Sequence, residues 1–220
     1  MKVLFAVALA ALACAGCSAS LTLDPPPTPK PPPVVTASPS APKDIRPLIE
    51  SQFAQSASVY RSWWPQYVTP GLHLLGTDSS SGAVSPCGPL SGGDAFYCPT
   101  DNGVYLDLGM MQDFSRLPRG DGATLATVAH ELGHAWQAQR HLEFSGSTVM
   151  NSELHADCLS GAVIAAIAPG SDALAQGAAD AYASGSMDWT NPQFHGTPTQ
   201  RRDVTLRGAG GLAACDSLIR

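Results

Sequence analysis

The sequence predicts an α+β domain over residues 44–220, with a small antiparallel sheet in the first half packed on a mainly helical second half. Three observations predict it. Short β-type runs flank an Asn-Gly turn at Asn102. Apolar residues recur at helical spacing over most of the remaining domain. Glycine and proline separate the later helical runs from one another.

The expected elements follow from these patterns in chain order. Asp44–Trp64 has apolar residues at helical intervals, and Pro65 ends the pattern. We then expect a strand, a loop rich in Ser, Gly and Pro, and two strands joined by the turn: Leu72–Leu75, Ser79–Gly93, Ala95–Cys98 and Val104–Leu108. Four further segments should be helices: Gly122–Arg140, Thr148–Ala168, Ser171–Ser184 and Thr197–Gly208.

The chain starts with a pattern typical of an export signal. Lys2 precedes the apolar run Val3–Leu12, which is too short to span a bilayer. The run leads into small residues before a cysteine, the pattern of a bacterial lipoprotein signal. We expect residues 1–16 to be the signal peptide and Cys17 the lipid attachment site, with Cys14 as the alternate. The other interpretation is a plain secretory signal cleaved near Ala19.

Residues 17–43 are expected to form a linker. Ten of the 19 prolines lie between Leu23 and Pro47, among Ser, Thr and Ala. Such composition favours an extended polyproline conformation, which suits a semi-rigid spacer. The protein is therefore expected in the cell envelope, anchored by lipid on the outer side of a bacterial membrane, or secreted if the cysteine is not lipidated.

Composition argues against a nucleic-acid partner. The formal net charge is −6, with only 12 Lys and Arg and no basic cluster. Binding of nucleic-acid phosphates requires clustered positive charge, so we expect no nucleic-acid partner for this protein.

Four cysteines follow the linker: Cys87, Cys98, Cys158 and Cys215. An even number in an oxidising compartment favours two disulfides among three pairings. If Cys87 and Cys98 close the Gly-rich loop, Cys158 and Cys215 would tie the end of the chain to an earlier helix. The absence of any CxxC spacing disfavours a zinc site built from these cysteines.

The sequence His130-Glu131-Leu132-Gly133-His134 has the spacing of a metal site. Apolar residues repeat at helical intervals around it, so the segment is expected to be a helix. Histidines four apart project from the same helix side and can bind one zinc ion. Glu131 then lies beside the metal, where its carboxylate can act as general base on a water. The alternative is two histidines that only pack or cap.

A third ligand has to come from elsewhere in the chain. A third histidine of the metzincin type would require Gly at position 137 and His at 140, where this chain has Gln137 and Arg140. Eighteen residues separate His134 from Glu153, which lies in a helical segment. We expect Glu153 as the third ligand. Asp157, one turn further on, should hydrogen-bond the far nitrogen of a ligand histidine, whereas His155 points elsewhere on the helix.

The motifs resemble those of the bacterial neutral zinc metallopeptidases. Four blocks and a final Cys215-Asp216 pair carry the likeness: Cys87-Gly88 with Phe96-Tyr97-Cys98-Pro99 and Val104–Leu108; Val128–His134; Glu153–Cys158; and His195–Arg201. The resemblance implies a zincin-like fold, one zinc ion bound by two histidines and a glutamate, and peptidase activity. It also implies that His195 or Arg201 can stabilise the oxyanion formed at the carbonyl, although both could equally be structural. A lipid signal and linker depart from the single membrane-spanning start usual in that family.

The expected function is hydrolysis of a peptide bond in a peptide or protein substrate, by a water that zinc activates and Glu131 deprotonates. Two alternatives stay open. One is a lipoprotein that keeps the zinc site to recognise an envelope partner without cleaving it. The other is an amidase for cell-wall peptides, because both substrates present the same amide bond.

Overall fold

The structure is a computed structural model that describes residues 44–76, 84–89, 93, 95–116, 119–144 and 148–219. The expected signal peptide, the lipid site at Cys17 or Cys14, and the Pro-rich linker lie outside these residues. Within the described part of the chain, no helix is both long and apolar enough to cross a membrane.

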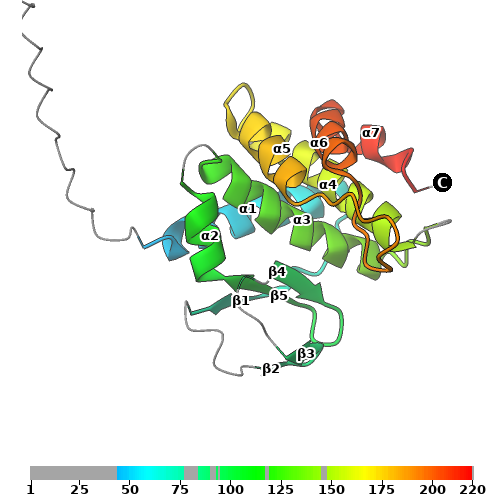
Figure 1. Ribbon diagram of the computed structural model, residues 1–220. Helices are drawn as coiled ribbons and strands as arrows, with labels where there is room; N and C mark the ends of the chain where they lie inside the picture. The colour runs from blue at the N-terminus through cyan, green and yellow to red at the C-terminus, as the bar shows by residue number, and fades with distance from the viewer. Residues whose placement is uncertain are drawn as a thin grey trace, which may run out of the picture. The chain divides into compact units, whose positions relative to one another are not determined.

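The described residues form an α+β domain, as predicted. Figure 1 shows the strands on one side of the domain and most of the helices on the other. In chain order the elements are α1 Arg46–Trp63, β1 Gly71–Leu75, β2 Val84–Ser85, β3 Gly88–Pro89, β4 Ala95–Cys98, β5 Gly103–Asp107, α2 Leu108–Phe114, α3 Asp121–Gln139, α4 Thr148–Ile167, α5 Ala173–Ala183, α6 Pro198–Arg207, the 3₁₀ turn η2 Gly208–Gly210 and α7 Leu212–Asp216.

The three-stranded sheet is mixed, whereas the sequence predicted an antiparallel one. Its order is β1-β5-β4; β4 is antiparallel to β5, as the Asn-Gly turn predicted, but β1 is parallel to it. A parallel pair needs a long crossover, which the chain from Leu75 to Gly103 supplies while also contributing β4. Alternation of residue types indicates which face of a strand is buried but carries no information on its direction.

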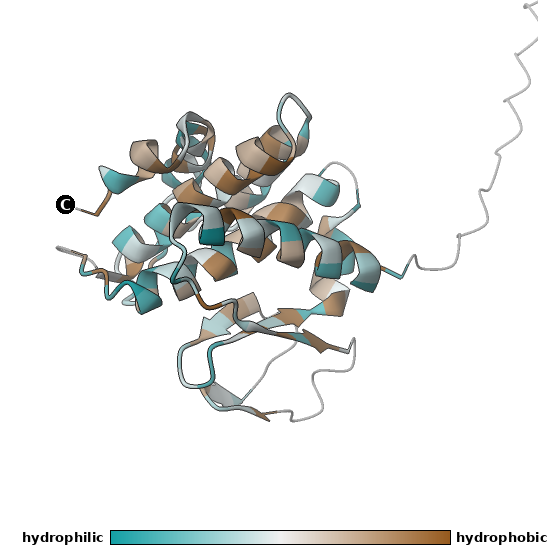
Figure 2. Cartoon of the chain, turned by 180° about the vertical axis from the view of Figure 1, so that it is seen from behind, coloured by the Kyte–Doolittle hydropathy of each residue, from teal (hydrophilic) through white to brown (hydrophobic). Residues whose placement is uncertain are grey.

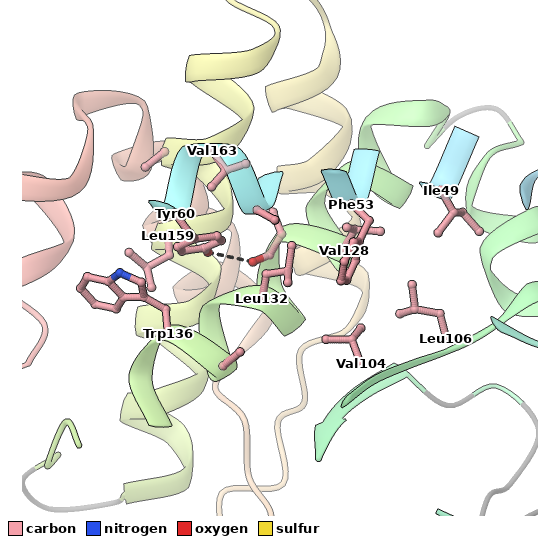
Figure 3. Close-up of a cluster of buried hydrophobic side chains, with 14 of the residues drawn as sticks. Ile49, Phe53, Tyr60, Val104, Leu106, Val128, Leu132, Trp136, Leu159 and Val163 are labelled. Carbon is pink, nitrogen blue, oxygen red and sulfur yellow. Dashed lines mark hydrogen bonds between the residues drawn. The ribbon is translucent and has the colours of Figure 1, made fainter. Parts of the chain in front are cut away.

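The hydrophobic core lies between the sheet, α1, α3 and α4. Figure 3 shows side chains of all four converging, with Val104 and Leu106 from β5 meeting Val128 and Leu132 from α3. Tyr60 of α1 is fully buried in the same cluster. Hydropathy colouring of the ribbon shows apolar stretches where the helices face one another and the sheet (Figure 2). The central helix α3 is therefore held from several sides.

Both expected disulfides are present. Cys87 is bonded to Cys98, which ties the short β2–β3 hairpin to β4. Cys158 is bonded to Cys215, 57 residues later, which ties α7 to α4. A covalent link over so long a loop removes much of the conformational entropy of the unfolded chain.

The helices of the second half pack at unusually short range through glycine. A Cβ atom at Gly161 would lie 1.9 Å from the carbonyl oxygen of Thr205, so only glycine allows α4 to approach α6 this closely. This approach places the start of α6 beside α4, where two of the predicted site residues lie.

Candidate metal centre

The His130–His134 motif lies in the middle of α3, and the core fixes this part of the helix. Tyr60 donates its hydroxyl hydrogen to the carbonyl oxygen of Ala129 at 2.8 Å (Figure 3), and Tyr67 donates to that of Leu132 at 3.1 Å. Both tyrosines are buried. Their hydrogen bonds hold the helix backbone on the side opposite the site, so the two histidines project from a rigid element.

Three donor atoms converge beside this helix. Nε2 of His130 and Nε2 of His134 are 3.0 Å apart, and the Glu153 carboxylate oxygens lie 3.2 Å from each of them. Ligands about 2.0–2.1 Å from a tetrahedral zinc ion lie about 3.3 Å from one another. The triangle of donors therefore has nearly the dimensions of one face of a zinc coordination sphere, and these residues could hold a metal ion.

On the His130 side, the supporting group is a carboxylate. Nδ1 of His130 lies 2.9 Å from Oδ1 of Asp157, and Asp157 also accepts two hydrogen bonds from Arg201, at 2.7 and 2.9 Å. All three side chains are buried. Burial would raise the pKa of Asp157, but the Arg201 charge and the hydrogen bond from His130 hold it below its usual value. Asp157 is thus ionised and accepts a hydrogen bond from Nδ1 of His130.

On the His134 side, the supporting group is the neutral amide of Gln137. Its Nε2 donates to the carbonyl of Ser152 at 2.8 Å and to Nδ1 of His155 at 3.0 Å, which fixes the amide orientation. Its Oε1 then faces Nδ1 of His134 at 2.9 Å, and an amide oxygen only accepts. Nδ1 of His134 must therefore carry the hydrogen, and Nε2 the lone pair.

The hydrogen-bond pattern explains why this arrangement fits zinc. In the neutral histidines, both Nε2 lone pairs and the Glu153 carboxylate point at one another, an arrangement that a divalent cation stabilises. Without a metal, protons on the histidines provide the positive charge that stabilises this arrangement. Burial lowers the pKa of His130, but its hydrogen bonds to Asp157 and Glu153 and the charges of these carboxylates raise the pKa to about 10. The donor set of two imidazoles and one carboxylate is one that zinc prefers.

The metal ligands line a cleft with a volume of about 870 Å³. Glu131 lines it too, from the same helix as the two histidines, and is itself buried. Burial raises the pKa of Glu131 above its usual value, although the neighbouring histidine charges oppose this effect. On the side of the sheet and α2 the cleft has apolar walls, including Phe96, Tyr97 and Phe114.

The two remaining predicted residues come from the segment around the start of α6. Nδ1 of His195 lies 3.6 Å from Oε2 of Glu153, and the side chain is 43% exposed at the cleft. Arg201 is buried; besides Asp157 it contacts the carbonyl of Ser184 at 3.3 Å and Glu153 at 3.8 Å. Because protein acceptors already engage its nitrogens, this geometry favours a positioning role for Arg201 and leaves His195 freer to meet a substrate.

Gln137 and Asp180 line the same cleft and were not among the predicted site residues. Gln137 follows His134 by three positions, so helical spacing alone could have found it. Asp180, on α5, accepts a hydrogen bond from Arg119 at 3.2 Å, and burial raises its pKa to about 6. No spacing signal relates Asp180 to the motif, because tertiary packing of α5 on α3 brings it there.

Comparison with known proteins agrees with this geometry. The model of the family described as "putative neutral zinc metallopeptidase" matches residues 50–182, more than half of the 220-residue chain. The matched segment includes the three metal-ligand candidates and Asp157, and it ends before His195 and Arg201. Searches among curated proteins and among solved structures gave no significant match. With its motifs and this match together, the chain belongs to the neutral zinc metallopeptidase family.

Proposed function

We propose that the protein is a zinc-dependent peptidase in which Glu131 is the general base, and that it acts at the outer side of a bacterial membrane. The observation that carries this proposal is the position of Glu131. Its carboxylate lines the cleft one residue from the ligand His130, and burial raises its pKa. A buried glutamate beside a metal centre suits a residue that must accept and return a proton near neutral pH.

Each step of the reaction has a residue suited to it. His130, His134 and Glu153 would hold the zinc ion, which when bound supplies Lewis-acid polarisation of a carbonyl and lowers the pKa of water. Glu131 accepts a proton from the attacking water on its carboxylate. It then donates that proton to the nitrogen of the leaving amine.

His195 can stabilise the carbonyl oxygen as it gains negative charge. The imidazole stands at the open side of the cleft near Glu153, and a hydrogen bond from it would contribute on the order of a few kcal/mol to the transition state. The apolar walls of the cleft suit the side chains of a peptide substrate better than a strongly charged ligand.

The test separates binding of zinc from catalysis. In the zinc-loaded protein, Glu131→Gln should retain one zinc ion but lose hydrolysis of a peptide library by at least about a hundredfold. Glu153→Ala should weaken zinc binding itself by orders of magnitude. The matched control for Glu131→Gln is Glu143→Gln, because Glu143 is exposed and does not line the cleft. Full activity in zinc-loaded Glu131→Gln would refute the general-base role. Chelator-insensitive cleavage by the wild type would refute zinc-dependent catalysis, and absent cleavage would favour a binding protein.

The location has its own test. The export signal and the position of Cys17 after Ala15-Gly16 support lipid anchoring. Labelling with radioactive palmitate in a bacterial host should mark the wild type and Cys14→Ser but not Cys17→Ser. Label on Cys17→Ser would move the attachment to Cys14, and no label on any of the three would favour a secreted protein.

A further inference from the structure

Large apolar side chains are concentrated in one exposed stretch. The described residues contain six exposed large hydrophobic side chains, and three of them, Tyr182, Met187 and Trp189, lie within eight residues at the end of α5 and in the loop that follows. Trp189 is 78% exposed and Met187 73% exposed. Exposed large apolar side chains that follow one another within a short segment indicate an interaction site more than single scattered ones do.

The loop between α5 and α6, residues 184–197, is anchored at both ends. The carbonyl of Ser184 accepts a hydrogen bond from Arg201, and the amide of Ser186 donates to the carbonyl of Gly196 at 3.0 Å. At its far end, Thr197 starts α6 with a capping box that includes Gln200. The base of the loop is therefore fixed to the same Arg201–Asp157 pair that supports the metal centre.

The tip of the loop is also ordered by its own hydrogen bonds. The hydroxyl of Thr190 donates to the Asp188 carboxylate at 2.6 Å, and the amide of Asp188 donates to the Ser186 hydroxyl at 3.0 Å. Trp189 and Met187 extend from this turn. Their exposure is thus a feature of a defined conformation, and a partner that binds them pays little for ordering the backbone.

The loop is continuous with the catalytic cleft. Ser184, Gln193 and His195 line the cleft, and His195 reaches Glu153. Figure 1 shows the loop, in orange, extending from α5 and α6 towards the side of the domain where the sheet lies. A polypeptide that occupies the cleft and leaves it past His195 would therefore pass along the loop.

We propose that the 184–197 loop is a docking rim for extended polypeptide substrates, with Met187 and Trp189 contacting apolar side chains that lie outside the cleft. The inference rests on the proposed peptidase function and narrows its substrate class to long, unfolded polypeptides with apolar residues. Tryptophan contributes large contact energies at interfaces, and methionine adapts to varied partners. Neither Met187 nor Trp189 lines the cleft, so substrate residues that lie outside the cleft would make these contacts.

Charge favours a polypeptide over a membrane surface as the occupant. Segments that bind anionic lipid surfaces combine aromatic residues with several Lys or Arg. Residues 184–197 contain neither Lys nor Arg, and the tip holds Asp188. The exposed side chains of the loop thus suit a neutral apolar chain.

The experiment compares two substrates in the full mature protein with zinc bound. One is a chemically unfolded, alkylated protein, and the other is a short peptide that carries a cleavage site from it. In Met187→Ser/Trp189→Ser, the ratio of kcat/KM for the unfolded protein to that for the short peptide should fall at least about tenfold, through KM. The matched control is Val68→Ser/Leu206→Ser, which removes two exposed apolar side chains that do not line the cleft. It should leave the ratio unchanged.

A binding measurement separates failure of the rim from failure of the peptidase. Zinc-loaded Glu131→Gln should bind the fluorescently labelled unfolded protein, and adding the two loop substitutions should weaken that binding at least about tenfold. If the wild type cleaves nothing but this difference persists, the peptidase proposal fails and the docking rim stands. An unchanged ratio and unchanged binding overturn the rim. Loss of binding to anionic phospholipid vesicles alone, with polypeptide kinetics intact, also overturns it and assigns the loop to the membrane.

Discussion

The two histidines of α3 offer the same atom to the metal, but the two sides of the site are supported by different chemistry. His130 is held by Asp157, a buried carboxylate that Arg201 grips through two hydrogen bonds. His134 is held by the uncharged amide of Gln137, which His155 and the Ser152 carbonyl orient. Hydrogen bonds between charged groups are about twice as strong as neutral ones.

This difference indicates a division of tasks. The charged side connects three elements, α3, α4 and α6, and strengthens the basicity of one ligand. The charged side is also more sensitive to substitution, because a buried charge that loses its partner destabilises the fold strongly. The neutral side joins only α3 to α4 and depends on one amide being correctly oriented. Loss of either side should therefore weaken zinc binding, and loss of the charged side should destabilise the fold more than loss of the neutral side.

The largest effect is expected for Asp157→Ala. It removes the acceptor of His130 and leaves the buried Arg201 guanidinium without its main partner. The free energy of unfolding should fall by about 3–5 kcal/mol, and zinc affinity by about 10–100-fold. Urea unfolding of the zinc-free protein and competition with a chelator measure the two effects.

The control for this change is Asp203→Ala. Asp203 also pairs with an arginine, Arg202, but both side chains are about half exposed. Such a pair contributes about 0–1 kcal/mol. If both variants lose the same amount, the Asp157–Arg201 pair is no stronger than a surface ion pair, and the comparison between the two sides collapses.

As the pH falls, the neutral side of the site, with Gln137 and His155, should be destabilised before the charged side, with Asp157 and Arg201. Burial and the nearby His134 and Arg140 charges lower the pKa of His155 to about 4. An unfolded histidine binds a proton near pH 6.5, so the folded state binds fewer protons between about pH 6.5 and 4, and stability falls as pH falls through that window. Asp157 has a pKa below its unfolded value of about 3.9, so its contribution is lost only at still lower pH.

The measurement is the free energy of unfolding of the zinc-free protein from pH 8 to 4, for the wild type and His155→Phe. The wild type should lose up to about 3 kcal/mol more than the variant over this range. Parallel curves for the two proteins would mean that His155 titrates normally and does not hold the amide of Gln137.

Prediction from the sequence succeeded where the pattern is local. The spacing of His130 and His134 on one helix, and of Glu153 and Asp157 on another, follows from 3.6 residues per turn, and the structure brings all four together. The helix boundaries agree to within two residues for α1, α3, α4, α5 and α6. The disulfide between Cys87 and Cys98 was also predictable, because the two cysteines are close in the sequence and flank the Gly-rich loop.

The features that could not be predicted from the sequence depend on tertiary contacts. Arg201 meets Asp157 across 44 residues, a pairing that no sequence period encodes. The direction of β1 depends on a crossover of the chain, and the short helix α2 begins where the side chain of Asp107, expected in a strand, caps it. In the sequence, Trp189 is one more apolar residue, and only its exposure in the folded structure distinguishes it from a core residue.

The smallest expected effect, and the most discriminating one, is at Gln137. Gln137→Glu would replace the neutral acceptor of His134 with a carboxylate, which makes this side resemble the His130 side. Zinc affinity should then be retained within about threefold at pH 8. The new carboxylate cannot donate to the Ser152 carbonyl or to Nδ1 of His155, so the free energy of unfolding should fall by about 1–3 kcal/mol.

Gln137→Leu is the partner variant, since it removes both functions of the amide. It should show a similar loss of stability but should also bind zinc about tenfold more weakly. The cobalt-substituted proteins provide a second readout, because the visible absorption of Co²⁺ responds to the orientation of its ligands. Equal zinc affinity in the Glu and Leu variants would mean that the acceptor on His134 does not matter, and that Gln137 only ties α3 to α4.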